Sequence, residues 1–186
     1  MSVGSPVLVR WTADELVGRL DEVLAVYAAA MGYPPDLVSA RRGFITAHAR
    51  RAGFRAVAAL DENDAVLGFG YGYLSTAGQW WHDQVRGAIR RGERRRWLTD
   101  AYELVELHVL PEAQGGGLGT RLLRGLLDGA PGRVVLLSTP EVADESSRAW
   151  RLYRAHGFVD VVRRMRFPGD DRPFAILGRP LPLPPT

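Results

Sequence analysis

The alternation of apolar and polar positions predicts interleaved strands and helices. The stretch VLVRW (7–11) alternates as a strand does, and apolar residues recur at helical spacing from Thr12 to Gly32. Thr12 and Glu15 have the spacing of a capping box, and Gly32 is a typical stop signal. A second helix is expected from Pro35 to Arg51, because proline is favoured in the first turn of a helix.

The next two apolar stretches predict an antiparallel hairpin. They run from Phe54 to Leu60 and from Ala65 to Ser75, and the turn DEND (61–64) joins them. Glycines alternate with aromatic residues along the second strand, so one of its faces lacks side chains. The residues are Gly68, Gly70 and Gly72 on one face, and Phe69, Tyr71 and Tyr73 on the other. The bare face permits close approach of a packed helix or of a ligand.

The second half of the chain predicts a strand–helix–strand unit, then a helix and a hairpin. Two strands joined through a helix lie parallel in one sheet. The expected elements are strand Tyr102–Leu110, helix Thr120–Gly129, strand Arg133–Thr139, helix Asp144–Phe158 and hairpin strands Val159–Phe167 and Phe174–Leu181. The sequence therefore predicts an α/β fold whose mixed sheet is antiparallel at its start and parallel in its middle.

The composition fits a single globular domain over residues 1–186. Hydrophobic residues make up 46% of the chain and charged residues 24%, which is ordinary for such a domain. No apolar run approaches about 18 residues and no signal-peptide pattern opens the chain, so we expect a cytoplasmic protein without a membrane partner. Cysteine is absent, which excludes disulfides and thiolate chemistry.

The basic residues exclude further classes of function. All 24 are arginine, so neither a lysine-dependent phosphate loop nor a Schiff-base lysine can exist. The net charge of +3 does not by itself indicate nucleic-acid binding. The four histidines lack metal-ligand spacing, and there is no GxSxG motif. We therefore expect no metal and no covalent serine intermediate.

The glycine-rich stretch LHVLPEAQGGGLGTRLL (107–123) lies where a strand gives way to a helix. Glycine lets backbone approach a ligand closely, and a helix N-terminus presents unpaired N–H groups, so together they favour an anion such as phosphate. The dinucleotide spacing GxGxxG fails here, because the required last glycine is replaced by Thr120 or Leu122. The spacing that remains is Q-x-x-G-x-G, formed by Gln114, Gly117 and Gly119.

This spacing resembles the central motif of the GNAT-superfamily N-acetyltransferases. A second stretch, AWRLYRAHGF (149–158), resembles that family's A-x-x-L-Y-x-x-x-G-F motif and follows at the right distance. The resemblance is strong from Tyr102 to Phe158 and rests on element order elsewhere. It implies a single GNAT-like α/β domain, with a mixed sheet of about seven strands, a splayed central parallel pair and flanking helices.

The resemblance also implies acetyl-CoA as co-substrate. Its pyrophosphate would lie on the glycine turn and its pantetheine arm along the preceding strand. The residues implied are Leu107, His108, Val109, Gln114, Gly115, Gly116, Gly117, Leu118, Gly119, Thr120 and Ser146. Ser146 stands where the family often has asparagine, and its shorter side chain puts that contact in question.

Acetyl transfer to an amine needs a base and a proton donor, because an alkylammonium group is not a nucleophile. Tyr153 matches the motif tyrosine that protonates the departing sulfur, although it could also be a core residue. Glu103 and Glu106 are the candidate bases, acting directly or through water, and strand alternation places them on opposite faces unless a bulge intervenes. Either could instead be a salt-bridged carboxylate, and His108 is expected to be structural.

Residues 79–98 predict a helical insertion that could form a lid over the acceptor. Trp80 and Trp81 are candidate walls of the acceptor pocket, and six arginines lie between Arg86 and Arg96. These arginines could contact an anionic acceptor, the 3′-phosphate of CoA or RNA, or form a solvated helix face.

The sequence thus predicts an enzyme that transfers acetyl directly to a primary amine of a small molecule or peptide within a ternary complex. Two alternatives remain: a non-catalytic acyl-CoA sensor, and acetylation of an RNA-linked amine. Nucleic acid is not the expected partner, and the resemblance allows a homodimer.

Overall fold

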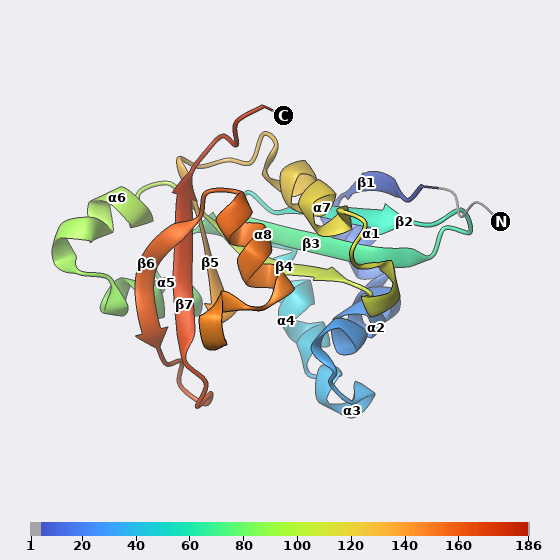
Figure 1. Cartoon of the computed structure of the whole chain (residues 1–186), viewed down its shortest axis with the longest axis horizontal. Coiled ribbons are helices and arrows are strands. Elements are labelled where there is room, and N and C mark those ends of the chain that lie inside the picture. Colours follow the sequence, from blue (N-terminus) through green and yellow to red (C-terminus); the bar gives the residue numbers. More distant parts are fainter. Residues whose placement is uncertain (1–4, 186) are drawn as a thin grey trace. The chain divides into compact units, whose positions relative to one another are not determined.

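The computed structural model describes residues 5–185, whose seven strands form one mixed sheet in the order β1-β2-β3-β4-β5-β7-β6 (Figure 1). The chain groups into two compact units. Unit 1 comprises residues 5–73 and Val105–Gly129, and unit 2 comprises Leu74–Leu104 and residues 130–185. The predicted α/β class with a seven-strand mixed sheet is confirmed.

Unit 1 holds the amino-terminal strands and the helix after the glycine turn. Its elements are β1 (Val7–Trp11), α1 (Ala13–Gly18), α2 (Leu20–Met31), α3 (Pro35–Val38), α4 (Arg41–His48), β2 (Arg55–Leu60), most of β3 (Val66–Ser75), the end of β4 (Ala101–Val109), η2 (Pro111–Ala113) and α7 (Leu118–Leu127). Strands β1, β2 and β3 are antiparallel neighbours. The predicted hairpin of β2 and β3 is therefore confirmed.

The predicted capping box is present, but the first helix is interrupted. The Glu15 N–H donates to Thr12 Oγ1 at 3.2 Å, and the Thr12 N–H donates to Glu15 Oε2 at 2.7 Å. Gly32 ends α2 with φ 67°. At Arg19 the backbone leaves helical geometry, with φ −112° and ψ 25°, and separates α1 from α2. The second expected helix is likewise divided into α3 and α4. Apolar residues keep their helical spacing across a short break in the backbone, so the spacing predicted one continuous helix in each case.

The bare face of β3 packs beneath α7. A Cβ placed on Gly68 would lie 2.8 Å from the His108 carbonyl oxygen and 3.0 Å from Leu122 Cδ1. A Cβ on Gly70 would lie 2.8 Å from Leu107 Cδ1. Helix packing is therefore what these two glycines permit. The opposite face of β3 carries aromatic residues that form a core with α1, α2 and α4.

Unit 2 holds the carboxy-terminal strands and the predicted helical insertion. Its elements are α5 (Trp80–Ala88), η1 (Arg91–Glu93), α6 (Arg94–Leu98), the start of β4, β5 (Val134–Pro140), η3 (Ala143–Glu145), α8 (Arg148–Ala155), β6 (Val159–Met165) and β7 (Phe174–Pro180). Strands β4 and β5 pair in parallel over Ala101–Glu103 and Val134–Leu136, as predicted. Strand β7 pairs antiparallel with both β5 and β6.

The insertion packs against the sheet of unit 2 through its apolar residues (Figure 1). Trp97 is 3% exposed, and a Cβ placed on Gly178 of β7 would lie 2.7 Å from the Trp97 ring. The expected helical insertion is therefore present as α5, η1 and α6. No helix within residues 5–185 is long and apolar enough to cross a membrane.

Helix α8 begins later than expected. Asp144 and Glu145 have positive φ, and the helix starts at Arg148 after Ser147, whose Oγ accepts from the Trp150 N–H at 3.2 Å. The expectation that the helix begins at Asp144 was wrong, because Ser147 is the residue whose side chain caps the first turn. Gly157, with φ 76°, follows its last turn as predicted.

Two arginines hold α8 to the strand that follows it. Arg154 and Arg163 each lie 5.0 Å from the centre of the buried Trp150 ring. Both also form ion pairs with Glu145 and Asp160, at 2.5–3.2 Å. Cation–π contact and ion pairing therefore act on the same two guanidinium groups.

We expect Gly68→Ala to destabilise the protein by roughly 1–3 kcal/mol, the usual cost of overpacking. The new Cβ would meet the backbone oxygen of His108, which cannot move as a side chain can. Gly43→Ala is the matched control, because Gly43 is exposed in α4 and its Cβ would meet nothing within 4 Å. This control should be neutral or stabilise by up to about 1 kcal/mol. Urea denaturation measures both, and equal stabilities would contradict the tight contact.

Candidate active site

The glycine turn connects η2 to α7 with bare, exposed backbone. Gly115 has φ 93° and Gly117, the residue before α7, has φ 76°, a region in which glycine is favoured. Gln114 holds the start of the turn, because its Nε2 donates to the Val109 carbonyl oxygen at 3.0 Å. A Cβ on Gly116 or Gly117 would meet nothing within 4 Å. Open space therefore adjoins the N-terminus of a ten-residue helix, which fits the approach of a phosphate group.

The strand segment before the turn is half-buried and belongs to the same unit. Leu107, His108 and Val109 end β4, and the Leu110 N–H donates to the Leu67 carbonyl oxygen at 2.9 Å. Unit 1 thus brings together every residue from Leu107 to Thr120 that the resemblance implies for the co-substrate.

A buried carboxylate lies immediately before this segment. Glu106 is 8% exposed, and its Oε2 lies 2.6 Å from His108 Nε2. Its Oε1 accepts from Arg41 Nη1 of α4 at 3.2 Å. Strand alternation explains why Glu106 and His108 meet, because residues two apart share a face.

The charges around Glu106 keep it ionised. Burial by itself raises the pKa of the Glu106 carboxyl, but the hydrogen bond and charge of His108, with the charge of Arg41, outweigh burial and leave the pKa below its ordinary value. A carboxylate can only accept a hydrogen bond, so the hydrogen between the two groups is on His108 Nε2. In neutral His108, Nδ1 is then the nitrogen that can accept a proton.

Tyr27, Arg41 and His48 complete this cluster, and sequence reasoning did not select them. The Arg41 guanidinium lies 4.9 Å from the centre of the Tyr27 ring, and Tyr27 packs edge-on against His108 at 5.1 Å. His48 Nδ1 lies 3.0 Å from the Tyr71 hydroxyl. Burial, reinforced by the positive charge of Arg51, lowers the pKa of His48 to about 4. These residues lie on α2 and α4, and their local sequence carries no motif that signals the contact.

The other candidates lie in unit 2. Tyr153 is 7% exposed on α8, and its ring lies 5.5 Å from that of Phe158. Glu103 is buried on β4 opposite Leu136 of β5. Ser146 is exposed in the turn before α8.

The two tryptophans of the insertion differ in environment. Trp81 is 9% exposed, and its indole N–H donates to Ser138 Oγ at 3.2 Å. Trp80 is 54% exposed and lies against Phe167, with 5.6 Å between ring centres. Trp81 is therefore a core residue, and Trp80 is the one with a surface open to a ligand.

Comparison with known proteins gives the family. Residues 22–158 match the Acetyltransferase (GNAT) family. A GCN5-like protein acetyltransferase of Mycobacterium tuberculosis, Rv2170, is 44% identical over 91% of this chain and 95% of its own length. A GNAT-family acetyltransferase from Bacillus cereus has the same fold, with a TM-score of 0.62, 17% identity and coverage of 95% of this chain and 98% of its own.

A further solved relative contains the co-substrate. It is the phosphinothricin acetyltransferase of Sinorhizobium meliloti in complex with acetyl-CoA, with a TM-score of 0.56, 21% identity and coverage of 95% of this chain and 89% of its own. The family match and the 44% identity to Rv2170 together show that the chain described here is an acetyltransferase. It belongs to the GNAT family of N-acetyltransferases, as the two motifs predicted.

The ionised form of Glu106 should stabilise the fold in a pH-dependent way. Its folded pKa lies below the ordinary value of 4.5, so its contribution is complete above the unfolded pKa and is lost as pH falls through the folded pKa. We expect Glu106→Gln to lower the free energy of unfolding by roughly 2 kcal/mol at neutral pH, because it removes hydrogen bonds to a charged group.

Urea titrations of both proteins at pH 7, 5 and 3.5 measure this difference. The difference should be the same at pH 7 and 5, which lie above the ordinary pKa of 4.5, and should shrink at pH 3.5, because there the unfolded state gains a proton that the folded carboxylate resists. A difference that stayed constant over the whole range would show that the charge of Glu106 contributes nothing.

Proposed function

We propose that this enzyme acetylates primary amines of proteins or peptides by direct transfer from bound acetyl-CoA. The observation that carries the proposal is the 44% identity, over nearly the whole of both chains, to a relative described as a protein acetyltransferase. A shorter match, 47% identical over 66 residues, is to an N-alpha-acetyltransferase of the same organism. Both names specify an amine on a polypeptide, so small-molecule amines are the comparison class.

The glycine turn would hold the co-substrate. Backbone N–H groups from Gly115 to Thr120 would receive the pyrophosphate, and the strand Leu107–Val109 would align the pantetheine arm. When bound there, acetyl-CoA supplies an acetyl group activated as a thioester. Support for this assignment comes from the open space at Gly116 and Gly117 and from the helix N-terminus beside them.

The Glu106–His108 pair would remove the proton from the acceptor amine. An alkylammonium has a pKa near 10, so a base must take a proton before nitrogen can attack the thioester carbonyl. The proton would pass to His108 Nδ1, and the adjacent Glu106 carboxylate would stabilise the imidazolium that forms. Glu103 remains the alternative base. The contact that favours Glu106 is its 2.6 Å separation from His108.

Tyr153 would give its hydroxyl proton to the departing sulfur as the carbon–sulfur bond breaks. A phenol is a weaker acid than a thiol in water, so this transfer depends on position rather than on acidity. Packing of the Tyr153 ring against Phe158 and the Ser147 cap of α8 would fix that position.

An acceptor panel tests the proposed function. Release of free CoA should be fast with lysine-containing and free-N-terminal peptides and slow with small amines of similar pKa. The co-substrate site is tested with Gly116→Val, which adds a side chain into open space on unstrained backbone. This variant should lose acetyl-CoA binding, whereas Gly87→Val, an exposed glycine with equally open surroundings, should keep it. Fast turnover confined to small amines would overturn the choice of acceptor.

The proton-transfer roles predict two distinct kinetic defects. Tyr153→Phe should lower turnover about 10²–10⁴-fold and leave the affinity for CoA and the melting temperature nearly unchanged, because only the hydroxyl is removed. His108→Gln should lower turnover with the affinity for CoA little changed, because it removes the nitrogen that would take the proton. Full turnover in Tyr153→Phe would reduce Tyr153 to a packing residue. Full turnover in His108→Gln, together with a loss of turnover in Glu103→Gln, would reassign the base to Glu103.

A further inference from the structure

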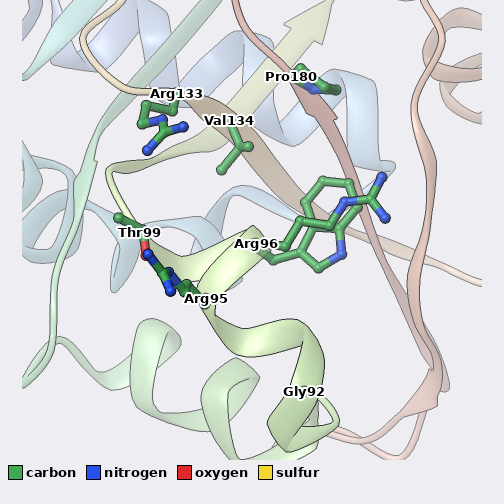
Figure 2. A pocket seen from close by; sticks show the side chains of 8 residues that line it. Gly92, Arg95, Arg96, Thr99, Arg133, Val134 and Pro180 are labelled. Atoms are coloured by element: carbon green, nitrogen blue, oxygen red, sulfur yellow. The ribbon is translucent and has the colours of Figure 1, made fainter.

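A cleft in unit 2 has features that neither acetyl transfer nor the fold requires. It lies between η1, α6, the start of β5 and the end of β7, and its volume is about 620 Å³, within the range of small-molecule sites. Arg95, Arg96 and Arg133 line it, and none of its eight lining residues is acidic. Figure 2 shows Arg95, Thr99 and Arg133 on one side of the cleft and Arg96 on the other. No residue proposed for the co-substrate or the amine belongs to it.

Two of these arginines have no counter-ion on the protein. Within residues 5–185, the side chains of Arg95 and Arg133 make no hydrogen bond or ion pair, and both are exposed. Arg96 is partly engaged, because its guanidinium lies over the Trp97 ring at 4.7 Å and 3.8 Å from Glu93. Three guanidinium groups around one cleft without a carboxylate repel one another, and a polyanion would relieve that repulsion.

The backbone that carries these side chains is held firmly. The Arg133 N–H donates to the Asp100 carbonyl oxygen at 2.8 Å, and the Arg133 carbonyl oxygen accepts from the Leu181 N–H at 2.9 Å. Trp97 follows Arg95 and Arg96 in sequence and precedes Thr99. It is buried against Gly178 of β7 and so anchors this segment. Binding would therefore require ordering of side-chain ends only, which keeps its entropic cost low.

We propose that this cleft binds a small polyanion, a ligand with two or more negative charges on phosphate or carboxylate groups. Arginine matches both groups because its planar guanidinium donates two parallel hydrogen bonds. Thr99 adds a hydroxyl that can donate a further bond. The cleft shares no residue with the proposed transfer chemistry, and the proposal does not depend on that chemistry.

Titration calorimetry on the intact chain, with pyrophosphate and citrate as probes at constant ionic strength, tests the proposal. We expect one equivalent of probe to bind, and the tighter probe identifies phosphate or carboxylate as the preferred group. Arg95→Gln combined with Arg133→Gln should weaken binding at least about tenfold, because both unpaired cations are lost. Arg90→Gln with Arg91→Gln is the matched control: it removes the same charge from exposed residues that precede Arg95 in the insertion but do not line the cleft, and it should change affinity less than about twofold.

Three outcomes would overturn the proposal. Equal weakening by both double variants would mean that only general surface charge attracts the probe. A second outcome is that pyrophosphate competes with CoA, and that Arg95→Gln/Arg133→Gln lowers the affinity for CoA but not for dephospho-CoA. That result would assign the cleft to the 3′-phosphate of the co-substrate. An RNA oligonucleotide that bound more tightly than either probe, and lost affinity equally in both double variants, would indicate a nucleic-acid surface.

A further variant, Gly92→Asp, tests the cleft without removing any arginine. It brings a carboxylate to the cleft lining at a position where a Cβ meets nothing within 4 Å, and it should lower the affinity for the probe.

Discussion

The close packing of α7 on the bare face of β3 is the contact on which the geometry of unit 1 depends. Leu122 and the neighbouring β4 backbone occupy the space that a side chain on Gly68 would need. The N-terminus of α7 is also the end of the glycine turn, so the depth at which this helix lies on the sheet sets where its free N–H groups point. A single methyl group on β3 would therefore act at a distance, by displacing the helix whose N-terminus is also the end of the glycine turn.

The opposite face of these strands holds Glu106, a buried carboxylate that stays charged. Glu106 is surrounded by a histidine on its own strand and an arginine from α4, and together they offset the penalty of burial. His48, nearby, is treated in the opposite way, since burial and arginines favour its neutral form. Within one cluster the protein thus holds a fixed negative charge beside a neutral imidazole.

The sequence predicted the elements and the glycine turn well because these depend on local rules. Gly32, Gly117 and Gly157 all adopt the positive φ that their positions as helix boundaries require. Two kinds of feature were missed. The break at Arg19 and the start of α8 at Ser147 depend on individual backbone angles and one hydroxyl hydrogen bond, which apolar spacing does not report.

The partners of Glu106 were missed for a different reason. Arg41 and His48 come from α4, more than fifty residues away in sequence from the strand they serve. Their positions follow from how the helices pack on the sheet, and a single sequence carries no local pattern for such a contact. The same reasoning separates Trp80 from Trp81, which are adjacent in sequence but differ in burial because successive helical residues point about 100° apart.

The choice of arginine in the Trp150 network has a consequence for an enzyme that works with a reactive thioester. Arg154 and Arg163 bind carboxylates and an aromatic ring at once, and lysine could provide similar charges. A lysine that became acetylated would turn into a neutral amide and release those carboxylates. The guanidinium group stays protonated and is a poor nucleophile, so it does not undergo this reaction under the same conditions. With arginine as its sole basic side chain besides histidine, the fold is held together by cations that are indifferent to the compound the enzyme consumes.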